Sequence, residues 1–351
     1  DGFGASVALS GDTALIGALY DDTLTESDAG SAYVFVRSGS AWSEQAKLTA
    51  DDGAGGDYFG MSVALSGDTA LVGAPNDDTL AGTNAGSAYA FVRTGGAWSG
   101  PAKLTAGDGS TFDEFGVAVA LSGDIALVGS PRSATVEGAD FGGAYEFVRS
   151  GGMWSQQSKL TADNAAARDR WMGTSIAFSG DTVLLGAPKD DTLVGENSGS
   201  AYVFVLRSGR WSEQVKLGAE DGGADDQFGS SVALSGDTVL VGSPQGDTPG
   251  AAGAGSAYVF VRAGNLWGME GKLVAGDAAQ GDGFGWSVAL SGDTALVGAL
   301  GDEHPEPPVI DSGSAYVFVR SGGAWSEQAK LNVGDGTNDG RFGSSVALSG
   351  E

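Results

Sequence analysis

One unit of 56 to 58 residues repeats along the whole chain, and this periodicity constrains the fold more than any other feature. Six tryptophans mark it at intervals of 56, 56, 57, 56 and 58 residues: Trp42, Trp98, Trp154, Trp211, Trp267 and Trp325. The second copy reads FGMSVALSGDTALVGAPNDDTLAGTNAGSAYAFVRTGGAWSGPAKLTAGDG. No linker and no change of composition separates the copies. We therefore expect one array of structural repeats, although 351 residues would otherwise suggest two or three domains.

Six complete copies are followed by the start of a seventh. The boundaries are placed at residues 1–56, 57–112, 113–169, 170–225, 226–281 and 282–339, with a partial copy at 340–351. Phe-Gly opens every copy except the fourth, which has Trp171-Met172-Gly173. The first residues, Asp1-Gly2-Phe3-Gly4, match Asp282-Gly283-Phe284-Gly285 in the middle of the array. The sequence is therefore expected to be a piece of a longer array.

Each copy contains four short segments with the composition of β-strands. SVALSG and TALVGAP are joined through Ser-Gly-Asp-Thr, and SAYVFV and WSEQAKL through Arg-Ser-Gly-Gly or a close variant. Both connections favour tight hairpins. The first three segments are apolar with little alternation, as expected when both faces of a sheet are covered. The fourth alternates and carries Glu, Gln and Lys, so it is expected at a solvated edge.

Four antiparallel strands in a repeat of this length are typical of a β-propeller blade. The small first strand is expected to line the central axis, where Trp286 replaces a small residue and would fill space. A β-solenoid is the alternative, but its repeats are usually shorter and its strands parallel. The predicted fold class is all-β, a β-propeller of four-stranded antiparallel blades. Six complete repeats plus the first strand of a seventh leave six or seven blades open.

Several motifs of the second copy resemble a known family. Phe59-Gly60, Val72-Gly73-Ala74-Pro75 and Gly86-Ser87-Ala88-Tyr89-Ala90-Phe91 resemble the FG-GAP repeat of integrin α-subunit propellers and, more closely, the FG-GAP-like arrays of bacterial secreted and surface proteins. The resemblance covers essentially the whole chain. It implies a seven-bladed ring, an extracellular location and a role in adhesion or recognition. Copies one and six depart from it, with Gly17-Ala18-Leu19 and Gly298-Ala299-Leu300 where the motif has proline.

Calcium-binding blades of that family carry a DxDxDG-type loop between the first and second strands. Here the same place holds a single carboxylate, such as Asp68, on a two-residue turn. Calcium takes six to eight oxygen ligands. The family's usual calcium site is therefore expected to be absent.

The composition excludes several functional classes. The chain has 45 acidic and 18 basic residues and a net charge of −27, so its surface repels the phosphates of nucleic acids. The absence of cysteine excludes disulfides, thiolate zinc sites and a cysteine nucleophile. A single histidine, His304, argues against Ser-His-Asp chemistry. No apolar run of about 18 residues is present that could insert into a membrane.

The acidic residues are concentrated in two sets of connections that share one face of an up-and-down blade. The connections between second and third strands, together with the segments between copies, carry 33 of the 45 acids. Only five basic residues accompany them: Arg132, Arg168, Arg170, Lys189 and Arg341. One strongly negative face is therefore expected, which costs self-repulsion unless cations screen it.

Clustered carboxylates in these connections suggest a cation site, because calcium selects hard oxygen ligands. We predict calcium as the cofactor. The predicted ligands are Asp21, Asp22, Asp28, Asp51, Asp52, Asp57, Asp77, Asp78, Asp190 and Asp191. Two alternatives stay open: the acids are turn formers in solvated loops, or they reflect adaptation to a salty habitat.

Residues that do not repeat are the other candidates. Tyr20, Tyr58, Phe112 and Phe141 are expected on the acidic face, where aromatic rings beside carboxylates can stack on sugars, and are predicted to bind ligand. A catalytic carboxylate pair normally occurs once, in an apolar pocket, whereas nearly all acids here recur in glycine-rich loops. No catalytic residue is predicted, and a glycan-active enzyme is the least favoured interpretation.

Together these observations predict a non-catalytic extracellular or cell-surface module for adhesion, recognition or scaffolding. Its expected partner is a protein or glycan at the cell surface. The alternative is a structural subunit that binds copies of itself in an extracellular filament or sheath, which the near-identical units favour.

Overall fold

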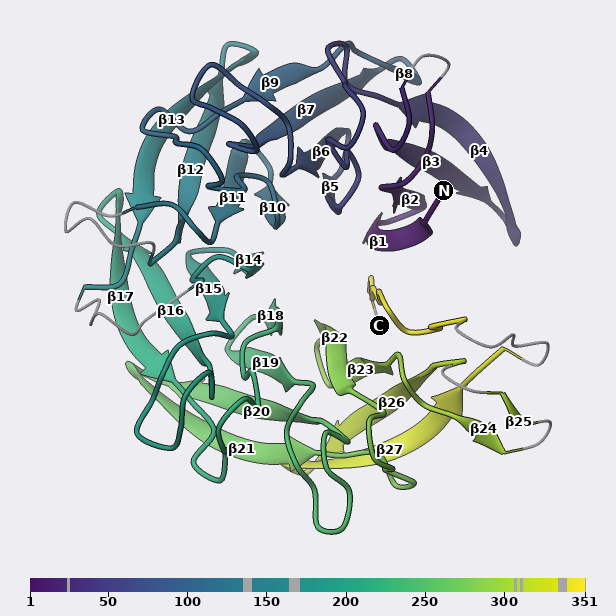
Figure 1. Cartoon of the computed structure of the whole chain (residues 1–351), viewed down its shortest axis with the longest axis vertical. Helices are drawn as coiled ribbons and strands as arrows, with labels where there is room; N and C mark the ends of the chain where they lie inside the picture. Colours follow the sequence, from purple (N-terminus) through teal and green to yellow (C-terminus); the bar gives the residue numbers. More distant parts are fainter. Residues whose placement is uncertain are drawn as a thin grey trace. The chain divides into compact units, whose positions relative to one another are not determined.

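The described residues form six antiparallel blade sheets that follow one another along the sequence, and one small two-stranded sheet. The computed structural model describes residues 1–23, 26–134, 141–163, 171–305, 308–309, 312–333 and 340–350. Within these ranges there is no helix. In each of these six sheets the first, second, third and fourth strands pair in chain order, with both β8 and β9 paired to β7 in blade 2, so each repeat builds its own blade (Figure 1).

The strand bounds follow the repeat closely. Blades 1 to 3 contain β1 (Phe3–Ser10), β2 (Thr13–Ala18), β3 (Ser31–Ser38), β4 (Ala41–Leu48), β5 (Ser62–Ser66), β6 (Thr69–Ala74), β7 (Ser87–Thr94), β8 (Ala97–Trp98), β9 (Ala102–Leu104), β10 (Val119–Ser122), β11 (Ile125–Ser130), β12 (Gly143–Ser150) and β13 (Met153–Leu160). Blades 4 to 6 contain β14 (Ser175–Ser179), β15 (Thr182–Ala187), β16 (Ser200–Arg207), β17 (Arg210–Leu217), β18 (Ser231–Ser235), β19 (Thr238–Ser243), β20 (Ser256–Ala263), β21 (Leu266–Leu273), β22 (Phe284–Ser291), β23 (Thr294–Ala299), β26 (Ser314–Ser321) and β27 (Ala324–Leu331). The short strands β24 (His304–Pro305) and β25 (Pro308–Val309) pair between β23 and β26. In blade 2 the fourth strand is split into β8 and β9 beside Pro101, because proline cannot donate to a ladder.

Blades 1 to 3 form one compact unit together with Trp171–Ile176, and a second unit contains blades 4 to 6 from Ala177 onward. In the first unit β1 lies beside β5 and β5 beside β10, and in the second β18 lies beside β22 (Figure 1). The second strands β6, β15 and β19 are buried throughout, whereas β4 is exposed along most of its length. The covered second strand and the solvated fourth strand are thus confirmed, whereas the first strands β1 and β14 are mostly half-buried and less covered than predicted.

Six four-stranded antiparallel blades, one for each complete repeat, are those of a β-propeller, so the predicted fold class is confirmed. The described residues form six blades rather than the seven that the family resemblance implies. The start of the seventh copy lies against blade 6: Phe342 forms a parallel bridge with Gly313, and the Ser291 hydroxyl donates to the Gly350 carbonyl at 2.8 Å.

The Phe-Gly pair that opens the second copy is inserted between two blades. The backbone of Phe59 forms a parallel bridge with Gly30 of blade 1, while its ring packs on Tyr89 and Phe91 of blade 2 with centroids 5.4 and 6.1 Å apart. Phe59 is only 1% exposed. A Cβ atom on Gly30 would lie 2.1 Å from the Phe59 carbonyl oxygen, so this contact requires glycine.

A β-bulge in the fourth strand directs a side chain toward the next blade. In blade 1 the pairing of β3 with β4 skips Gln45, and its side-chain oxygen accepts a hydrogen bond from Trp98 Nε1 of blade 2 at 3.0 Å. A bulge inserts one residue and changes where its side chain points. The same bond recurs in the second unit from Trp267 to Gln214 and from Trp325 to Glu270. The repeating tryptophan therefore fastens one blade to the next.

Candidate functional site

The acidic connections gather at one end of the blades, here called the loop end. It consists of the 2–3 loops, which join second to third strands, and of the segments between blades. In the first unit Gly56 N donates to the Ser27 carbonyl at 3.2 Å, and in the second Asp225 N donates to the Glu196 carbonyl at 2.8 Å. Each 2–3 loop is thus bound to the segment that leads into the following blade.

A lysine from the fourth strand reaches into the loop end and pairs with its carboxylates. In blade 2, Asp77 accepts from Lys103 Nζ at 2.6 Å and from the Tyr89 hydroxyl at 3.1 Å. Asp52, on the preceding segment, accepts from the same two groups at 2.6 and 2.9 Å. Asp77 is only 4% exposed. We call these four residues and their equivalents the carboxylate–lysine cluster.

The cluster recurs with variations. Its members are Asp21, Tyr33 and Lys47 in blade 1, Asp190, Tyr202 and Lys216 in blade 4, and Asp277, Asp302, Tyr316 and Lys330 in blade 6. Blades 3 and 5 have Ser133 and Gly246 at the loop position, where Lys159 and Lys272 pair with Asp108 and Asp221.

Six lysines thus bring positive charge to the loop end. The loop end is therefore less negative than the sequence analysis predicted. The prediction counted only residues of the connections, whereas these lysines belong to the fourth strands. A signal was present in the sequence, because the loop aspartate precedes its tyrosine by 12 residues in blades 1, 2 and 4.

The cluster lowers the pKa of Asp52. Burial acts to raise the pKa of Asp52, but hydrogen bonds from Lys103 and Tyr89 outweigh it, so this pKa lies below its usual value. Burial likewise acts to lower the pKa of Lys103, and its pairing with Asp52 and Asp77 raises that pKa instead. Asp52 and Lys103 therefore remain an ion pair at neutral pH.

The other predicted metal ligands serve the loop backbone. Asp22, Asp78 and Asp191 accept the backbone N–H of Asp28, Asn84 and Asn197 at 2.9, 2.8 and 2.8 Å. The buried Asp57 accepts the N–H of Ala54 at 2.7 Å, Asp28 is half-buried, and Asp51 is exposed. No three metal-ligating side chains converge within the described ranges. This arrangement does not supply the six to eight oxygens that calcium takes, and calcium binding stays a prediction.

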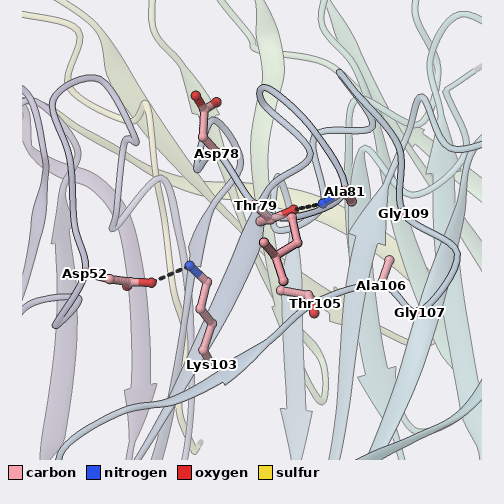
Figure 2. A pocket seen from close by; sticks show the side chains of 10 residues that line it. Asp52, Asp78, Thr79, Ala81, Lys103, Thr105, Ala106, Gly107 and Gly109 are labelled. Carbon is pink, nitrogen blue, oxygen red and sulfur yellow. Dashed lines mark hydrogen bonds and ion pairs between the residues drawn. The ribbon is translucent and has the colours of Figure 1, made fainter.

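Two open grooves lie at the loop end of the first unit. The larger, of about 890 Å³, is lined by Asp52, Asp78, Leu80, Lys103 and Thr105, among others. Figure 2 shows the Lys103–Asp52 pair on one side and the turn at Thr79 on the other. The second groove, of about 660 Å³, lies beside Lys47 in blade 1. Such grooves offer hydrogen-bonding groups and charge to an extended polar ligand.

A rigid turn presents an apolar side chain beside the larger groove. Thr79 and Gly82 exchange backbone hydrogen bonds at 3.1 Å in both directions, and the Thr79 hydroxyl accepts from Ala81 N at 3.1 Å. Leu80, at the tip, is fully exposed. Leu193 is equally exposed at the same position of blade 4. Both leucines add apolar surface to the loop end.

Two of the four predicted ligand-binding aromatics lie together. Tyr20 and Tyr58 pack edge to face with ring centroids 5.5 Å apart, and Tyr20 is 49% exposed. Phe112 is exposed, whereas Phe141 is buried and offers little ring surface to a ligand. Trp286, expected to fill space near the axis, is 47% exposed.

Positions that differ between otherwise equal copies form what we call the variable row. In the first unit these are Tyr20, Tyr58, Glu114, Arg132 and Trp171. The Arg132 guanidinium lies 3.2 Å from a Glu114 carboxylate oxygen and 5.1 Å from the centroid of the Trp171 ring. The sequence draws attention to Tyr20, Tyr58 and Trp171 as non-repeating residues, whereas Glu114 and Arg132 were missed and would emerge only from aligning the copies. The non-repeating residues Arg168 and Arg170 lie outside the described residues.

The buried Asp282 makes stability depend on pH. It is 2% exposed; burial raises its pKa to about 6, although its bond from Ala279 N at 2.7 Å lowers it. Because the pKa is higher in the folded than in the unfolded state, the protonated group stabilises the fold. This contribution is complete below pH 3.8 and is lost as the pH rises through about 6. From pH 5 to pH 8 this single group should cost roughly 1 to 1.5 kcal/mol of unfolding free energy.

Urea unfolding of the Asp282→Asn variant tests this assignment. Asparagine keeps the acceptor for Ala279 N and cannot ionise, so the variant should lose less stability than the parent over that pH range. Parallel pH profiles for the two proteins would show that the group does not titrate as assigned.

The blades are four-stranded, and their grooves and variable side chains lie at one end. These features are those of a β-propeller that serves as an interaction module. The family model of the FG-GAP repeat matches residues 1–35, 42–91, 98–147, 154–204, 211–260 and 267–318, and the chain belongs to the FG-GAP repeat family. Propellers of this family are protein-interaction or adhesion modules, typically without enzymatic activity and typical of extracellular proteins. Comparison with curated proteins finds no match. The described part of the chain contains no helix suited to crossing a bilayer.

Proposed function

We propose that this chain is a non-catalytic recognition module of the extracellular space or the cell surface, with the variable row as its contact surface. One observation carries the proposal: Tyr58, Glu114 and Trp171 have φ values of +59°, +55° and +66°. An L-residue in this region costs roughly 1 kcal/mol more than glycine. Other copies have Gly2 and Gly283 at the same position, so the fold accepts glycine there. Glycine at these positions would relieve the backbone strain. The presence of larger side chains despite this strain indicates that they serve binding.

The chemistry of the row supports a protein or glycan partner. Tyrosine, tryptophan and arginine are the residues that dominate binding energy at interfaces. Tyr20 and Tyr58 offer ring faces and edges, and Arg132 lies between a carboxylate and an indole. The groove beside Leu80 adds hydrogen-bonding groups to the same end of the unit. The aspartates of this end are held by lysine, tyrosine and backbone groups, which favours binding over catalysis.

Glycine substitutions separate binding from stability. Tyr58→Gly and Glu114→Gly should leave the unfolding free energy unchanged or raise it by up to about 1 kcal/mol, because they relieve positive φ. The parent is first screened against an array of extracellular-matrix proteins and glycans. The same variants should bind the ligand found in this way at least about tenfold more weakly than the parent does.

The matched control is Ser208→Gly, in the turn between β16 and β17, which relieves a φ of +51° at a hairpin that belongs to neither set of connections. It should leave binding unchanged. Parental affinity in both row variants would refute the assignment of the contact surface.

A further inference from the structure

Blade 5 retains the carboxylate–lysine cluster but lacks one of its carboxylates. Its 2–3 loop has Gly246 at the position that Asp77 occupies in blade 2. In blades 1, 2, 4 and 6 that aspartate accepts from the cluster lysine at 2.6 to 2.8 Å. Four copies therefore show which chemical group belongs in the place that Gly246 leaves without a side chain.

The rest of the cluster is unchanged around this place. Lys272 Nζ lies 2.7 Å from Asp221, and the Tyr258 hydroxyl lies 2.9 Å from the same carboxylate. The corresponding distances in blade 2 are 2.6 and 2.9 Å. The lysine has not moved to compensate for the missing aspartate, and its side chain is 26% exposed. A ligand from solvent can therefore reach it.

A buried hydroxyl faces the same place. Ser256 Oγ is 3.5 Å from the position that a Cβ atom of residue 246 would take. Ser256 is 0% exposed, and its hydroxyl has no hydrogen-bond partner among the described residues. A buried hydroxyl without a partner is costly. The equivalent hydroxyls of Ser31, Ser87, Ser200 and Ser314 lack a partner too, although their blades have the loop aspartate, so Ser256 lines the place in blade 5 without being assigned as a donor.

Blade 3 lacks the loop aspartate too, but there the protein has adapted. Ser133 takes the loop position and donates to the Ser130 carbonyl at 2.9 Å, and Lys159 Nζ donates to the Ala134 carbonyl at 2.8 Å. The lysine of blade 3 thus has a substitute acceptor. This difference singles out blade 5.

We propose that blade 5 binds the carboxylate group of a ligand in the place of the missing aspartate side chain. The Lys272 ammonium donates to it, as the cluster lysine does to the loop aspartate in the other four blades. Charge does not forbid the second carboxylate, because Lys103 and Lys330 each hold two, Asp52 with Asp77 and Asp277 with Asp302. The site is independent of the variable row, and either assignment can fail without the other.

Acetate is the probe, with sodium chloride of equal ionic strength as its reference. We expect saturable binding in the millimolar range, seen as exchange broadening of ¹³C-acetate, and a rise in melting temperature of about 1 to 3 °C at tenfold excess over Kd. Gly246→Asp should supply the carboxylate internally and abolish the response. Lys272→Met should abolish it as well, and Asp77→Gly should create a second site in blade 2.

The source of the carboxylate is resolved by a peptide pair. If N-acetylglycylglycine binds more tightly than acetate, and its C-terminally amidated form does not bind, the ligand is the end of a protein chain. Equal affinities of N-acetylglycylglycine and acetate would indicate a small free acid. The proposal is overturned if acetate acts no differently from chloride, or if its effect persists in folded Gly246→Asp and Lys272→Met proteins.

Discussion

Replacing Gly116 by alanine is expected to lower the unfolding free energy of the first unit by about 4 kcal/mol. Two causes add. Gly116 has a φ of +102°, which an alanine rarely adopts, and its Cβ atom would lie 2.2 Å from the Ser87 carbonyl oxygen. Backbone fills the space on that side, so no flexible side chain can move away. Blade 2 would have to separate from the Phe-Gly segment of blade 3.

A second glycine separates the two causes. Gly123 has a φ of +57° in the turn between β10 and β11, and nothing lies within 4 Å of the position that a Cβ atom would take there. Gly123→Ala should therefore cost only about 1 kcal/mol. Chemical denaturation followed by tryptophan fluorescence measures both. Equal losses would mean that backbone conformation alone matters and that the close approach of blades 2 and 3 contributes little.

Replacing Lys103 by methionine is expected to cost about 3 kcal/mol or more. The change leaves Asp77, which is 4% exposed, without its cation and beside the carboxylate of Asp52. An unpaired buried charge is among the more destabilising defects a substitution creates. Adding Asp77→Asn should recover much of the loss, because it removes the buried charge.

Blade 5 provides the matched control. Lys272→Met removes the equivalent lysine where Gly246 leaves no buried loop carboxylate, and its partner Asp221 has a side chain 56% exposed. The loss should be about 1 kcal/mol or less. Denaturation midpoints of the two single variants provide the comparison. A cost at Lys272 equal to that at Lys103 would show that packing of the lysine stem, rather than the buried charge, dominates.

The blades were predictable because each strand is specified locally. Ser62–Ser66 and Thr69–Ala74 are apolar runs on either side of a Gly-Asp turn, and that information suffices for a hairpin. Repetition then supplied the architecture, since one blade cannot bury its own faces.

The site was predictable only in part, because its contacts join residues far apart. Lys103 pairs with Asp52 across 51 residues, and nothing in the alternation of the fourth strand indicates where its lysine points. The left-handed backbone of Tyr58 is equally invisible in a side-chain pattern. Phe141 belongs to an acidic connection, yet tertiary packing buries it.

The bond from the repeating tryptophan to the bulged residue of the copy before it, made by Trp98, Trp267 and Trp325, has an evolutionary consequence. Trp98 reaches Gln45 across 53 residues, and Trp267 reaches Gln214 across the same interval. A copy with glutamine or glutamate at the bulge thus carries both halves of the junction, a donor for the blade behind it and an acceptor for the blade ahead, whereas copy 2 has Pro101 at the acceptor position. A gene that gains or loses a copy with both halves by unequal recombination therefore restores the bond at the new junction, which keeps such arrays adjustable in length.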